Sequence, residues 1–298
     1  MNKPKLIVLV GLPGCGKSTY AKKLLDPQGY CRYVSSDQLR EELFGDEAIQ
    51  GDPKTVFKHV HDKTKQLLTT GYDVVYDATN VTRKNRKNIV QQFGKIADIE
   101  AHIVWAPFNE CVVRDRERKR TVGEDVISKF LHRWQSPYYD EGFSKIKLVF
   151  NCNVGWDRVH YNNCLLENMN IDHENPHHSL NIADHCAEAE NYVLNKYGNP
   201  VLCEAAAFHD CGKPMTKGFK SDENGRMIPV AHYYQHDNVG GYLVYGCYGS
   251  DNMNRAIQVS WIVCNHMQPY FQSKYYKEMD ASYKKNIDII HEADVHAH

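Results

Sequence analysis

The segment Gly11-Leu-Pro-Gly-Cys-Gly-Lys-Ser18 matches the pattern G-x-x-x-x-G-K-[ST] at every fixed position. An apolar run over residues 5–10 predicts a buried strand before it, and residues 19–25 have the mixed pattern of an amphipathic helix. A glycine-rich turn between a strand and a helix directs backbone N–H groups at an anion. We therefore expect this segment to bind a nucleoside triphosphate. The expected contacts are Gly11, Gly14, Cys15, Gly16, Lys17, Ser18 and Thr19.

Other side chains lie where the rest of a phosphoryl-transfer site would be. Lys17 is expected to reach the β- and γ-phosphates, and the Ser18 hydroxyl to coordinate Mg²⁺. Asp37 and Arg40 are one turn apart at the start of a predicted helix, so the carboxylate can accept a proton while the arginine holds an anion. Asp77 ends a predicted strand over residues 72–76, where a carboxylate approaches a metal or a substrate. Helix capping is the alternative role for both aspartates, with Arg40 as a surface partner.

Residues 114–120 contain five basic side chains among seven residues and join two predicted helices. In a phosphoryl-transfer enzyme such a segment forms a lid whose arginines stabilise charge on the transferred group. Arg116, Arg118 and Arg120 are equal candidates for this role. A solvated helix surface is the alternative for at least half of the basic side chains.

Histidine is concentrated in the second half of the chain, where 11 of the 16 histidines follow residue 170. Six histidines and aspartates recur there at intervals of 27 to 31 residues: His178, the adjacent His209 and Asp210, His236, His266 and Asp294. Such spacing predicts one inward residue from each successive helix or helix end, which is how helical bundles build metal sites. Nitrogen and oxygen ligands suit a divalent transition metal such as Mn²⁺, Ni²⁺, Co²⁺ or Zn²⁺.

The elements that position these groups change in type along the chain. Over residues 1–155, predicted strands alternate with predicted helices, which is typical of an α/β doubly wound parallel sheet with its ligands at the carboxyl ends of the strands. Residues 156–170 have little periodicity and are interpreted as a connector. Residues 171–298 are predicted to form an all-α domain.

Composition narrows the class of protein further. A length of 298 residues favours about two domains, and 42% hydrophobic with 24% charged residues is ordinary for a globular protein. The sequence has no apolar run long enough for a membrane span and no signal-peptide pattern at its start, so a cytoplasmic protein is expected. Ten cysteines without a C-x-x-C pair indicate reduced thiols.

Residues 4–150 resemble the phage-type polynucleotide 5′-kinase family. The resemblance is carried by the phosphate-binding loop, by Ser35-Ser-Asp-Gln-Leu-Arg40, by Val74-Val-Tyr-Asp-Ala-Thr-Asn80 and by the basic lid. It implies transfer of the γ-phosphate of ATP to a 5′-hydroxyl end of RNA or DNA, with Asp37 as the general base. It implies further that Arg40 contacts the acceptor's phosphate, that a lid arginine contacts ATP, and that the substrate lies near Asp77, Thr79 and Asn80. Ser36 departs from the family, which has an arginine immediately before the base.

The second half resembles the HD phosphohydrolase family through His178, through the sequence His209-Asp210-Cys-Gly-Lys213 and through Asp294. The resemblance implies that His178, His209, Asp210 and Asp294 bind a divalent metal, and that His236 and His266 hold a second one in dinuclear members. It also implies that Lys213 contacts a phosphate, with a helix C-cap lysine as the alternative.

Together the two resemblances predict a bifunctional enzyme that heals nucleic-acid ends. One domain would phosphorylate 5′-hydroxyls with ATP and Mg²⁺, and the other would remove a 2′,3′-cyclic or terminal phosphate. The products are the ends that a ligase joins, so a nucleic-acid ligase in the same pathway is the expected partner. Two alternatives remain open: a small-molecule or nucleotide kinase joined to a nucleotide hydrolase, and an ATP-dependent switch with a structural helical module.

Overall fold

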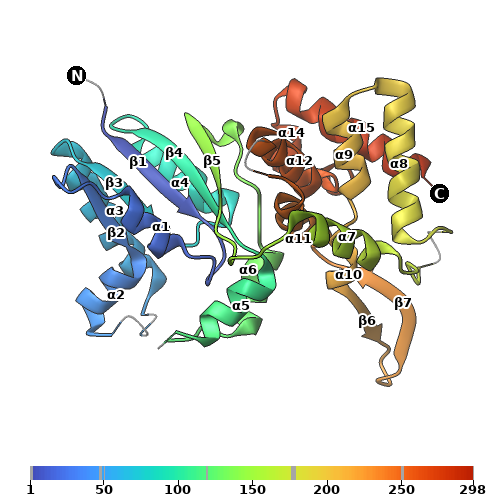
Figure 1. Ribbon diagram of the computed structural model, residues 1–298, viewed down its shortest axis with the longest axis horizontal. Coiled ribbons are helices and arrows are strands. Elements are labelled where there is room, and N and C mark those ends of the chain that lie inside the picture. The colour runs from blue at the N-terminus through green and yellow to red at the C-terminus, as the bar shows by residue number, and fades with distance from the viewer. Residues whose placement is uncertain are drawn as a thin grey trace. The chain divides into compact units, whose positions relative to one another are not determined.

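The computed structural model describes residues 3–46, 49, 51–118, 120–175, 179–249 and 252–297 (Figure 1). The chain divides into two compact units. The first unit comprises residues 1–130 and 137–154, and the second comprises residues 131–136 and 155–298. A short segment of the first half therefore belongs to the second unit, so the two units are not simply consecutive along the sequence.

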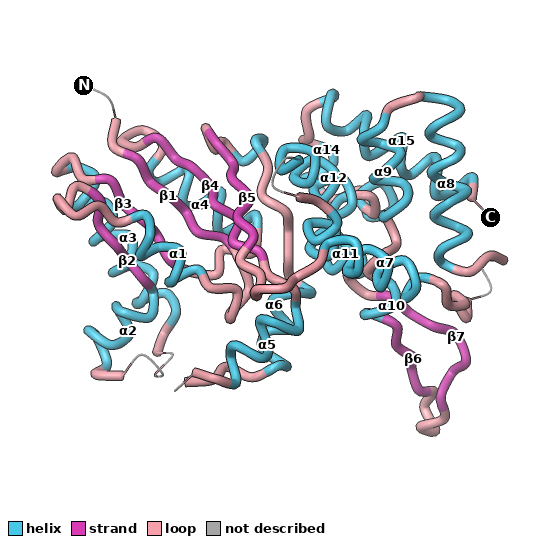
Figure 2. The backbone as a smooth tube through the Cα atoms, viewed as in Figure 1, coloured by secondary structure: helices cyan, strands magenta, loops and turns pink. Residues whose placement is uncertain are grey.

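The first unit is built on one five-stranded sheet in the order β2-β3-β1-β4-β5, shown in magenta in Figure 2. Its strands are β1 (Lys5–Val10), β2 (Cys31–Ser35), β3 (Asp73–Asp77), β4 (Asp98–Trp105) and β5 (Lys145–Phe150). All neighbouring strands pair in parallel. The predicted parallel sheet is confirmed, and its carboxyl edge carries the phosphate-binding loop after β1 and Asp77 at the end of β3.

Helices cover both faces of this sheet (Figure 1). On one face Ala21 packs against Leu9 and Val75. On the other face the ring of His61 lies 6.1 Å from that of Tyr76. The helices along this part of the chain are α1 (Lys17–Leu24), α2 (Ser36–Phe44), α3 (Pro53–Thr69), α4 (Arg83–Phe93), α5 (Phe108–Arg116), α6 (Glu124–His132) and the 3₁₀ turn η1 (Tyr139–Glu141).

Side-chain caps explain where several of these helices begin. Ser35 accepts hydrogen bonds from the backbone N–H groups of Asp37 and Gln38 at the start of α2. Asp52 caps α3 in the same way, with Pro53 in its first turn, and Thr82 caps α4. These are the residue types that supply an acceptor to the unpaired N–H groups of a first turn. The helix starts expected at Asp52 and Thr82 are confirmed.

The second unit is mainly helical. Its helices are α7 (Arg158–Met169), α8 (Ile182–Tyr197), α9 (Pro200–Phe208), α10 (Lys213–Thr216), α11 (His236–Val244), η2 (Tyr245–Cys247), α12 (Met253–Asn265), α13 (Gln268–Phe271), α14 (Lys274–Lys277) and α15 (Ala281–His296). Residues 131–136 contribute to its core, where the ring of Trp134 lies 5.0 Å from that of Tyr242. In the described part of the chain, every helix is too short or too polar to cross a membrane.

Two predictions for the second half are wrong. The expected connector over residues 156–170 contains α7, whose start is capped by the Asp157 side chain. The expected all-α domain also contains an antiparallel hairpin of β6 (Lys217–Ser221) and β7 (Met227–Tyr233), visible in Figure 2. Turn chemistry explains the hairpin, because Gly225 has φ +77° and Asp222 accepts the backbone N–H groups of Asn224 and Arg226.

Candidate functional site

The phosphate-binding loop owes its shape to two glycines at positive φ. Gly14 has φ +82°, and a Cβ there would lie 2.2 Å from the carbonyl oxygen of Cys111. Gly16 has φ +91°, and a Cβ there would lie 2.0 Å from Nδ2 of Asn151. That amide donates to the carbonyl oxygen of Cys15 at 2.8 Å, so Asn151 steadies the loop from the end of β5. The loop then leads into α1, which begins at Lys17 and carries Ser18 and Thr19 in its first turn.

Lys17 is held inside the loop that it serves. Its ammonium group donates to the carbonyl oxygens of Gly11 at 3.1 Å and Leu12 at 2.8 Å. The side chain is buried, so the loop wraps the lysine with backbone oxygens. An entering triphosphate can take over these bonds, because phosphate oxygens are stronger acceptors than peptide carbonyls.

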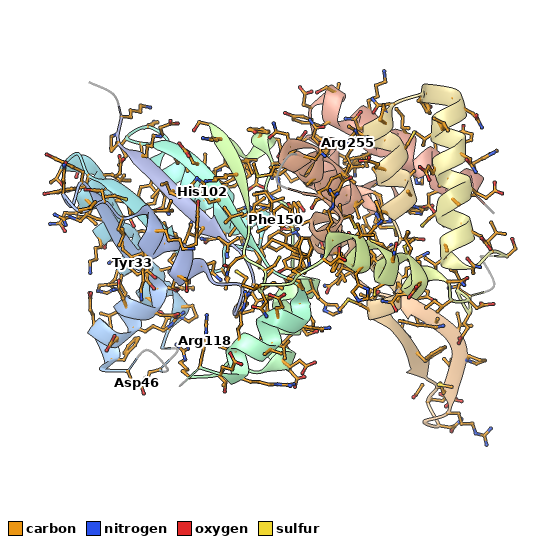
Figure 3. All side chains as sticks on the ribbon, in the orientation of Figure 1. Tyr33, Asp46, His102, Arg118, Phe150 and Arg255 are labelled. Atoms are coloured by element: carbon orange, nitrogen blue, oxygen red, sulfur yellow. The ribbon has the colours of Figure 1, made fainter. Side chains whose placement is uncertain are left out.

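Ser18 belongs to a small hydrogen-bond network at the carboxyl edge of the sheet. Its hydroxyl donates to Oδ2 of Asp77 at 2.8 Å, and the Tyr33 hydroxyl donates to the same oxygen at 2.6 Å. Burial raises the pKa of Tyr33, so this hydroxyl keeps its proton and remains a donor. The network thus joins a hydroxyl and a carboxylate, the oxygen ligands that Mg²⁺ accepts. Tyr33, labelled in Figure 3, was not a candidate in the sequence.

Asp37 lies two residues beyond Ser35, the strand residue whose register partner is Asp77. Its Oδ1 is 2.6 Å from Nη1 of Arg40 and 3.7 Å from Nη1 of Arg120. The Asp37 side chain is 54% exposed, whereas that of Arg40 is 12% exposed. The structure therefore brings together a solvent-accessible carboxylate, a nearly buried arginine and an arginine of the lid.

The lid arginines, which the sequence leaves equivalent, have different surroundings. Arg116 is 68% exposed and pairs with Glu124 at 2.7 Å, whereas Arg120 faces Asp37. The charge of Arg118 acts on the buried Cys15 thiol of the phosphate-binding loop, and the side chain is labelled in Figure 3. Asp115, which the sequence analysis missed, is buried and accepts the N–H groups of Val122 and Gly123.

Thr79 and Asn80 have structural contacts at this edge. The carbonyl oxygen of Thr79 accepts the N–H of Gly11 at 3.0 Å. The Asn80 amide donates to the Leu9 carbonyl at 2.8 Å, and its own carbonyl accepts from Arg86 at 3.0 Å. Asn80 is 3% exposed and has φ +48°, so its described contacts hold the strand before the loop in place.

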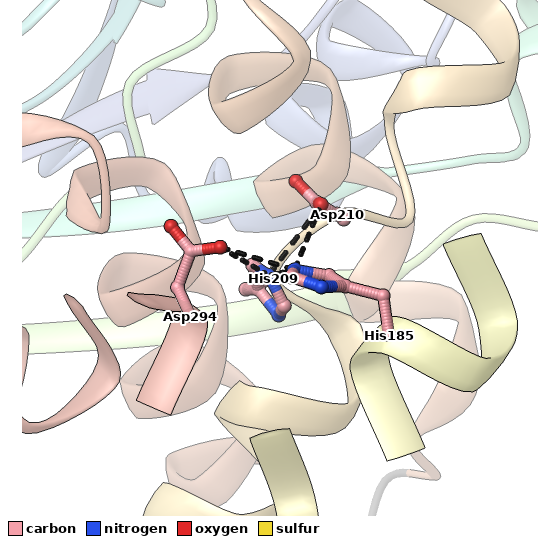
Figure 4. Close-up of side chains that lie close together, drawn as sticks. All are labelled: His185, His209, Asp210 and Asp294. Carbon is pink, nitrogen blue, oxygen red and sulfur yellow. Dashed lines mark hydrogen bonds and ion pairs between the residues drawn. The ribbon is translucent and has the colours of Figure 1, made fainter. Parts of the chain in front are cut away.

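In the second unit, imidazole and carboxylate side chains from separate helices converge. We call His185, His209, Asp210, His236, His266 and Asp294 the histidine–aspartate cluster. His185 Nε2 is 3.0 Å from Asp294 Oδ1 and 3.2 Å from His209 Nε2 (Figure 4). His236 Nε2 is 3.1 Å from His266 Nε2 and 3.2 Å from Asp210 Oδ1. Asp210 Oδ2 lies 3.5 Å from His209 Nε2, so this carboxylate joins the two halves of the cluster.

The cluster histidines share one orientation. Each Nδ1 faces a backbone carbonyl: that of Ala297 for His185, Ala206 for His209, Tyr233 for His236 and Val263 for His266. Because a carbonyl only accepts, we assign the proton of each ring to Nδ1, which leaves four Nε2 lone pairs facing the centre. Lone pairs about 3 Å apart repel unless a cation lies between them, so this donor set fits a divalent metal.

Electrostatics support the same use of the site. Burial alone raises the pKa of a carboxyl group, but Lys213 and the neighbouring histidines hold the pKa of Asp210 well below its usual range. The Lys213 ammonium is 2.5 Å from Asp210 Oδ2. Burial lowers the pKa of His266 to about 3, so this imidazole is neutral and can act as a ligand. Gly212 allows the turn after Asp210 to approach α11, because a Cβ there would lie 2.1 Å from the His236 carbonyl oxygen.

The first histidine of the cluster differs from the one that the sequence singled out. His178 lies outside the described residues. His185, seven residues later, occupies the corresponding place among the described residues and was missed. A signal was available, because His185 shares the buried face of α8 with Ile182, Cys186 and Ala189 at helical spacing. His173 was also missed; it is fully buried, with its ring 5.5 Å from that of His185.

Comparisons with known proteins concern the first half of the chain. Residues 6–138 match the family model described as AAA domain. The chain is 29% identical over 155 residues to the bifunctional polynucleotide phosphatase/kinase of Schizosaccharomyces pombe, covering 50% of this chain and 34% of the relative. It is 21% identical over 178 residues to the L-seryl-tRNA(Sec) kinase of Methanococcus maripaludis, covering 56% of this chain and 66% of the relative.

Among solved structures, the chain resembles part of the Pnkp1/Rnl/Hen1 RNA repair complex at 26% identity and a TM-score of 0.41, covering 44% of this chain and 43% of the other. The chain spans 34% and 66% of the lengths of the two curated relatives above. This fold implies ATP and Mg²⁺ as ligands of the first unit. The first half of the chain is a kinase-like P-loop domain related to polynucleotide kinases.

Proposed function

We propose that this chain heals nucleic-acid ends at two separate sites. The first unit would phosphorylate 5′-hydroxyl ends with ATP. The second would hydrolyse a 2′,3′-cyclic phosphate or a terminal 2′- or 3′-phosphate.

The kinase proposal is carried by the contact of Asp37 with both Arg40 and the lid residue Arg120. A carboxylate that is half exposed can accept the proton of a 5′-hydroxyl, whose oxygen then attacks the γ-phosphorus of ATP while the bond to ADP breaks. Arg40 would hold the acceptor's phosphate, and Arg120 would stabilise charge on the transferred group. Similarity to a polynucleotide phosphatase/kinase supports a polynucleotide as the acceptor.

The hydrolase proposal is carried by the four inward-facing Nε2 atoms beside Asp210 and Asp294. The cluster residues would hold one or two divalent cations, which lower the pKa of bound water and polarise a phosphoryl oxygen. Lys213, adjacent to Asp210, would bind the phosphate group of the substrate. Hydrolysis of a cyclic phosphate breaks one P–O bond with the oxygen and a proton of one water, and removal of the remaining phosphate consumes a second water.

The two products define the next reaction. A 5′-phosphate and a free 3′-hydroxyl are the ends that a nucleic-acid ligase joins. We therefore propose that a ligase consumes the product of this protein.

One oligonucleotide tests both activities. It carries a 5′-hydroxyl and a 2′,3′-cyclic phosphate and is incubated with ATP, Mg²⁺ and a panel of Mn²⁺, Ni²⁺, Co²⁺ and Zn²⁺, with both ends resolved. We expect Asp37→Ala to lower only 5′ phosphorylation, by about 10²- to 10⁴-fold, the usual contribution of a general base. Asp210→Ala should remove only healing of the 3′ end.

The outcomes separate the two halves of the proposal. A phosphorylated 5′ end with a cyclic phosphate that persists in every metal would refute the hydrolase half. Unchanged 5′ ends would refute the polynucleotide kinase half, and small-molecule acceptors would then be screened. Each variant is the control for the other, because it leaves the opposite unit intact.

A further inference from the structure

The histidine–aspartate cluster is reached from solvent near Asp294. The side chains of His185, His209, Asp210 and His266 are at most 2% exposed. That of Asp294 is 12% exposed, the largest value in the cluster. A phosphate ester has to approach the cluster where solvent reaches it, so the residues around Asp294 are the ones that the rest of the substrate meets.

Tyr270 is fixed beside this carboxylate. Its hydroxyl donates to Asp294 Oδ2 at 3.0 Å, on the oxygen opposite the one that faces His185. Its ring meets that of His291 edge-on, with the ring centroids 4.4 Å apart. Tyr270 is nevertheless 49% exposed. A flat ring is therefore held in place next to the cluster with about half of its surface free to bind another ring.

Phe271 lies next to it and is 64% exposed. The segment that presents it is well braced: the Gln272 side chain donates to the Pro269 carbonyl at 2.7 Å, and the Ser273 hydroxyl donates to the Gln268 side chain. The exposure of Phe271 thus comes from a defined turn. Two adjacent exposed aromatic rings at a substrate site need a functional explanation, because single scattered apolar residues are the normal case.

The charge around this pair favours an anionic chain. From Gln268 to Lys277 the sequence contains no aspartate or glutamate, and Lys274 and Lys277 follow the aromatic pair in α14. Lys274 lies 3.7 Å from Glu278, but both side chains are strongly exposed, so this pair holds the lysine weakly. Aromatic faces interleaved with cations are the combination that binds single-stranded nucleic acid, by base stacking and backbone attraction.

We propose that Tyr270 and Phe271 bind the base of the terminal nucleotide whose phosphate enters the histidine–aspartate cluster, with Lys274 and Lys277 near the preceding backbone phosphates. This inference rests on the proposed phosphoesterase function and deepens it. It makes the substrate of the second unit a nucleic-acid end and separates it from small phosphate esters that lack a base. Tyr270 also positions Asp294, because its hydroxyl holds the carboxylate oxygen that faces away from His185.

The test uses the full chain and two oligonucleotides with a 2′,3′-cyclic phosphate, one with a base on its last ribose and one with an abasic last ribose. Phe271→Ala should raise KM for the base-bearing end by about 5- to 100-fold, the range for one lost base–aromatic stack, with kcat nearly unchanged. The abasic end should be cleaved equally by the variant and the wild type. Phe219→Ala, at another exposed phenylalanine of the same unit, is the matched control and should change neither substrate.

A second variant separates the ring from the hydroxyl. Tyr270→Phe keeps the stacking surface, so it should keep the preference for the base-bearing end. It loses the bond to Asp294, and calorimetric titration with Mn²⁺ should show an affinity lower by about 10-fold, as when a residue supporting a metal ligand is removed. Equal Mn²⁺ affinity in the variant and the wild type would overturn the positioning role of Tyr270.

A binding measurement distinguishes failure of this inference from failure of the proposed function. An oligonucleotide ending in 2-aminopurine 3′-phosphate reports stacking by loss of its fluorescence. Quenching by the wild type but not by Phe271→Ala would support the stacking site even if no hydrolysis occurs. Hydrolysis that is equal for Phe271→Ala and wild type on both substrates would overturn the stacking site while the phosphoesterase stands. A wild type that neither binds nor cleaves would overturn both.

Discussion

The two units prepare for phosphate chemistry in opposite ways. In the first unit the anion site is made of backbone, formed by a glycine loop and a helix N-terminus, and the Asp37 side chain beside it is 54% exposed. In the second unit the site is made of side chains, and none of the cluster residues joined by these ion pairs is more than 12% exposed. The first site remains open to two substrates, whereas the second is assembled before any ligand arrives.

This difference follows from what each reaction requires. Phosphoryl transfer between two substrates needs groups that can close over them, and lid arginines on a loop can do so. A metal site needs several ligands at fixed short distances, and burial among helices supplies that rigidity. Burying carboxylates is costly unless cations pair with them, and the 2.5 Å contact of Lys213 with Asp210 meets part of that need.

The largest expected effect concerns which histidine belongs to the buried site. His185→Ala should lower affinity for the divalent metal by about 10³-fold, since losing even a residue that supports a ligand costs about 10- to 100-fold. His178→Ala, the residue that the sequence motif favoured, should retain most of that affinity. Calorimetric titration with Mn²⁺ measures both. If His178→Ala loses the metal and His185→Ala keeps it, the assignment from the sequence was right.

The second effect tests the open site of the first unit. Arg120→Ala should lower kcat for 5′ phosphorylation by about 10²-fold, the usual cost of removing one donor that stabilises transition-state charge. Arg116→Ala should change it less than about twofold, because an exposed pair such as Arg116 with Glu124 contributes little. Steady-state kinetics with a 5′-hydroxyl oligonucleotide compares them. The reverse ranking would contradict the assignment of Arg120 to the reacting phosphate.

The smallest effect tests how far the first site is preorganised. Tyr33→Phe removes one hydrogen bond to Asp77, which accepts from Ser18 on the same oxygen. We expect the Mg²⁺ concentration for half-maximal kinase activity to rise by about 2- to 12-fold, the usual worth of one such bond. A titration of activity against Mg²⁺ at saturating ATP measures it, with Tyr30→Phe as a control at an exposed tyrosine. An unchanged requirement would mean that Asp77 is held without Tyr33.

Prediction from sequence succeeded where neighbouring residues build the feature. The phosphate-binding loop needs glycines and a lysine within eight consecutive positions, and the capped starts of α3 and α4 need only an acceptor beside the first turn. The hairpin of β6 and β7 was missed because its turn lies inside a stretch interpreted as helical, although Asp222 and Gly225 carry turn chemistry. The helix α7 was missed because its amphipathic pattern is weak.

The sequence by itself determined the parallel sheet, the phosphate-binding loop and the presence of histidines and aspartates at helix ends. These depend on local patterns that any chain with the same order of residues would repeat. Only the tertiary structure decided that His185 joins the cluster, that Arg120 among the lid arginines faces Asp37, and that Tyr270 reaches Asp294. These contacts join residues 24 to 109 positions apart, and packing of whole elements, which no local pattern encodes, selects the partner.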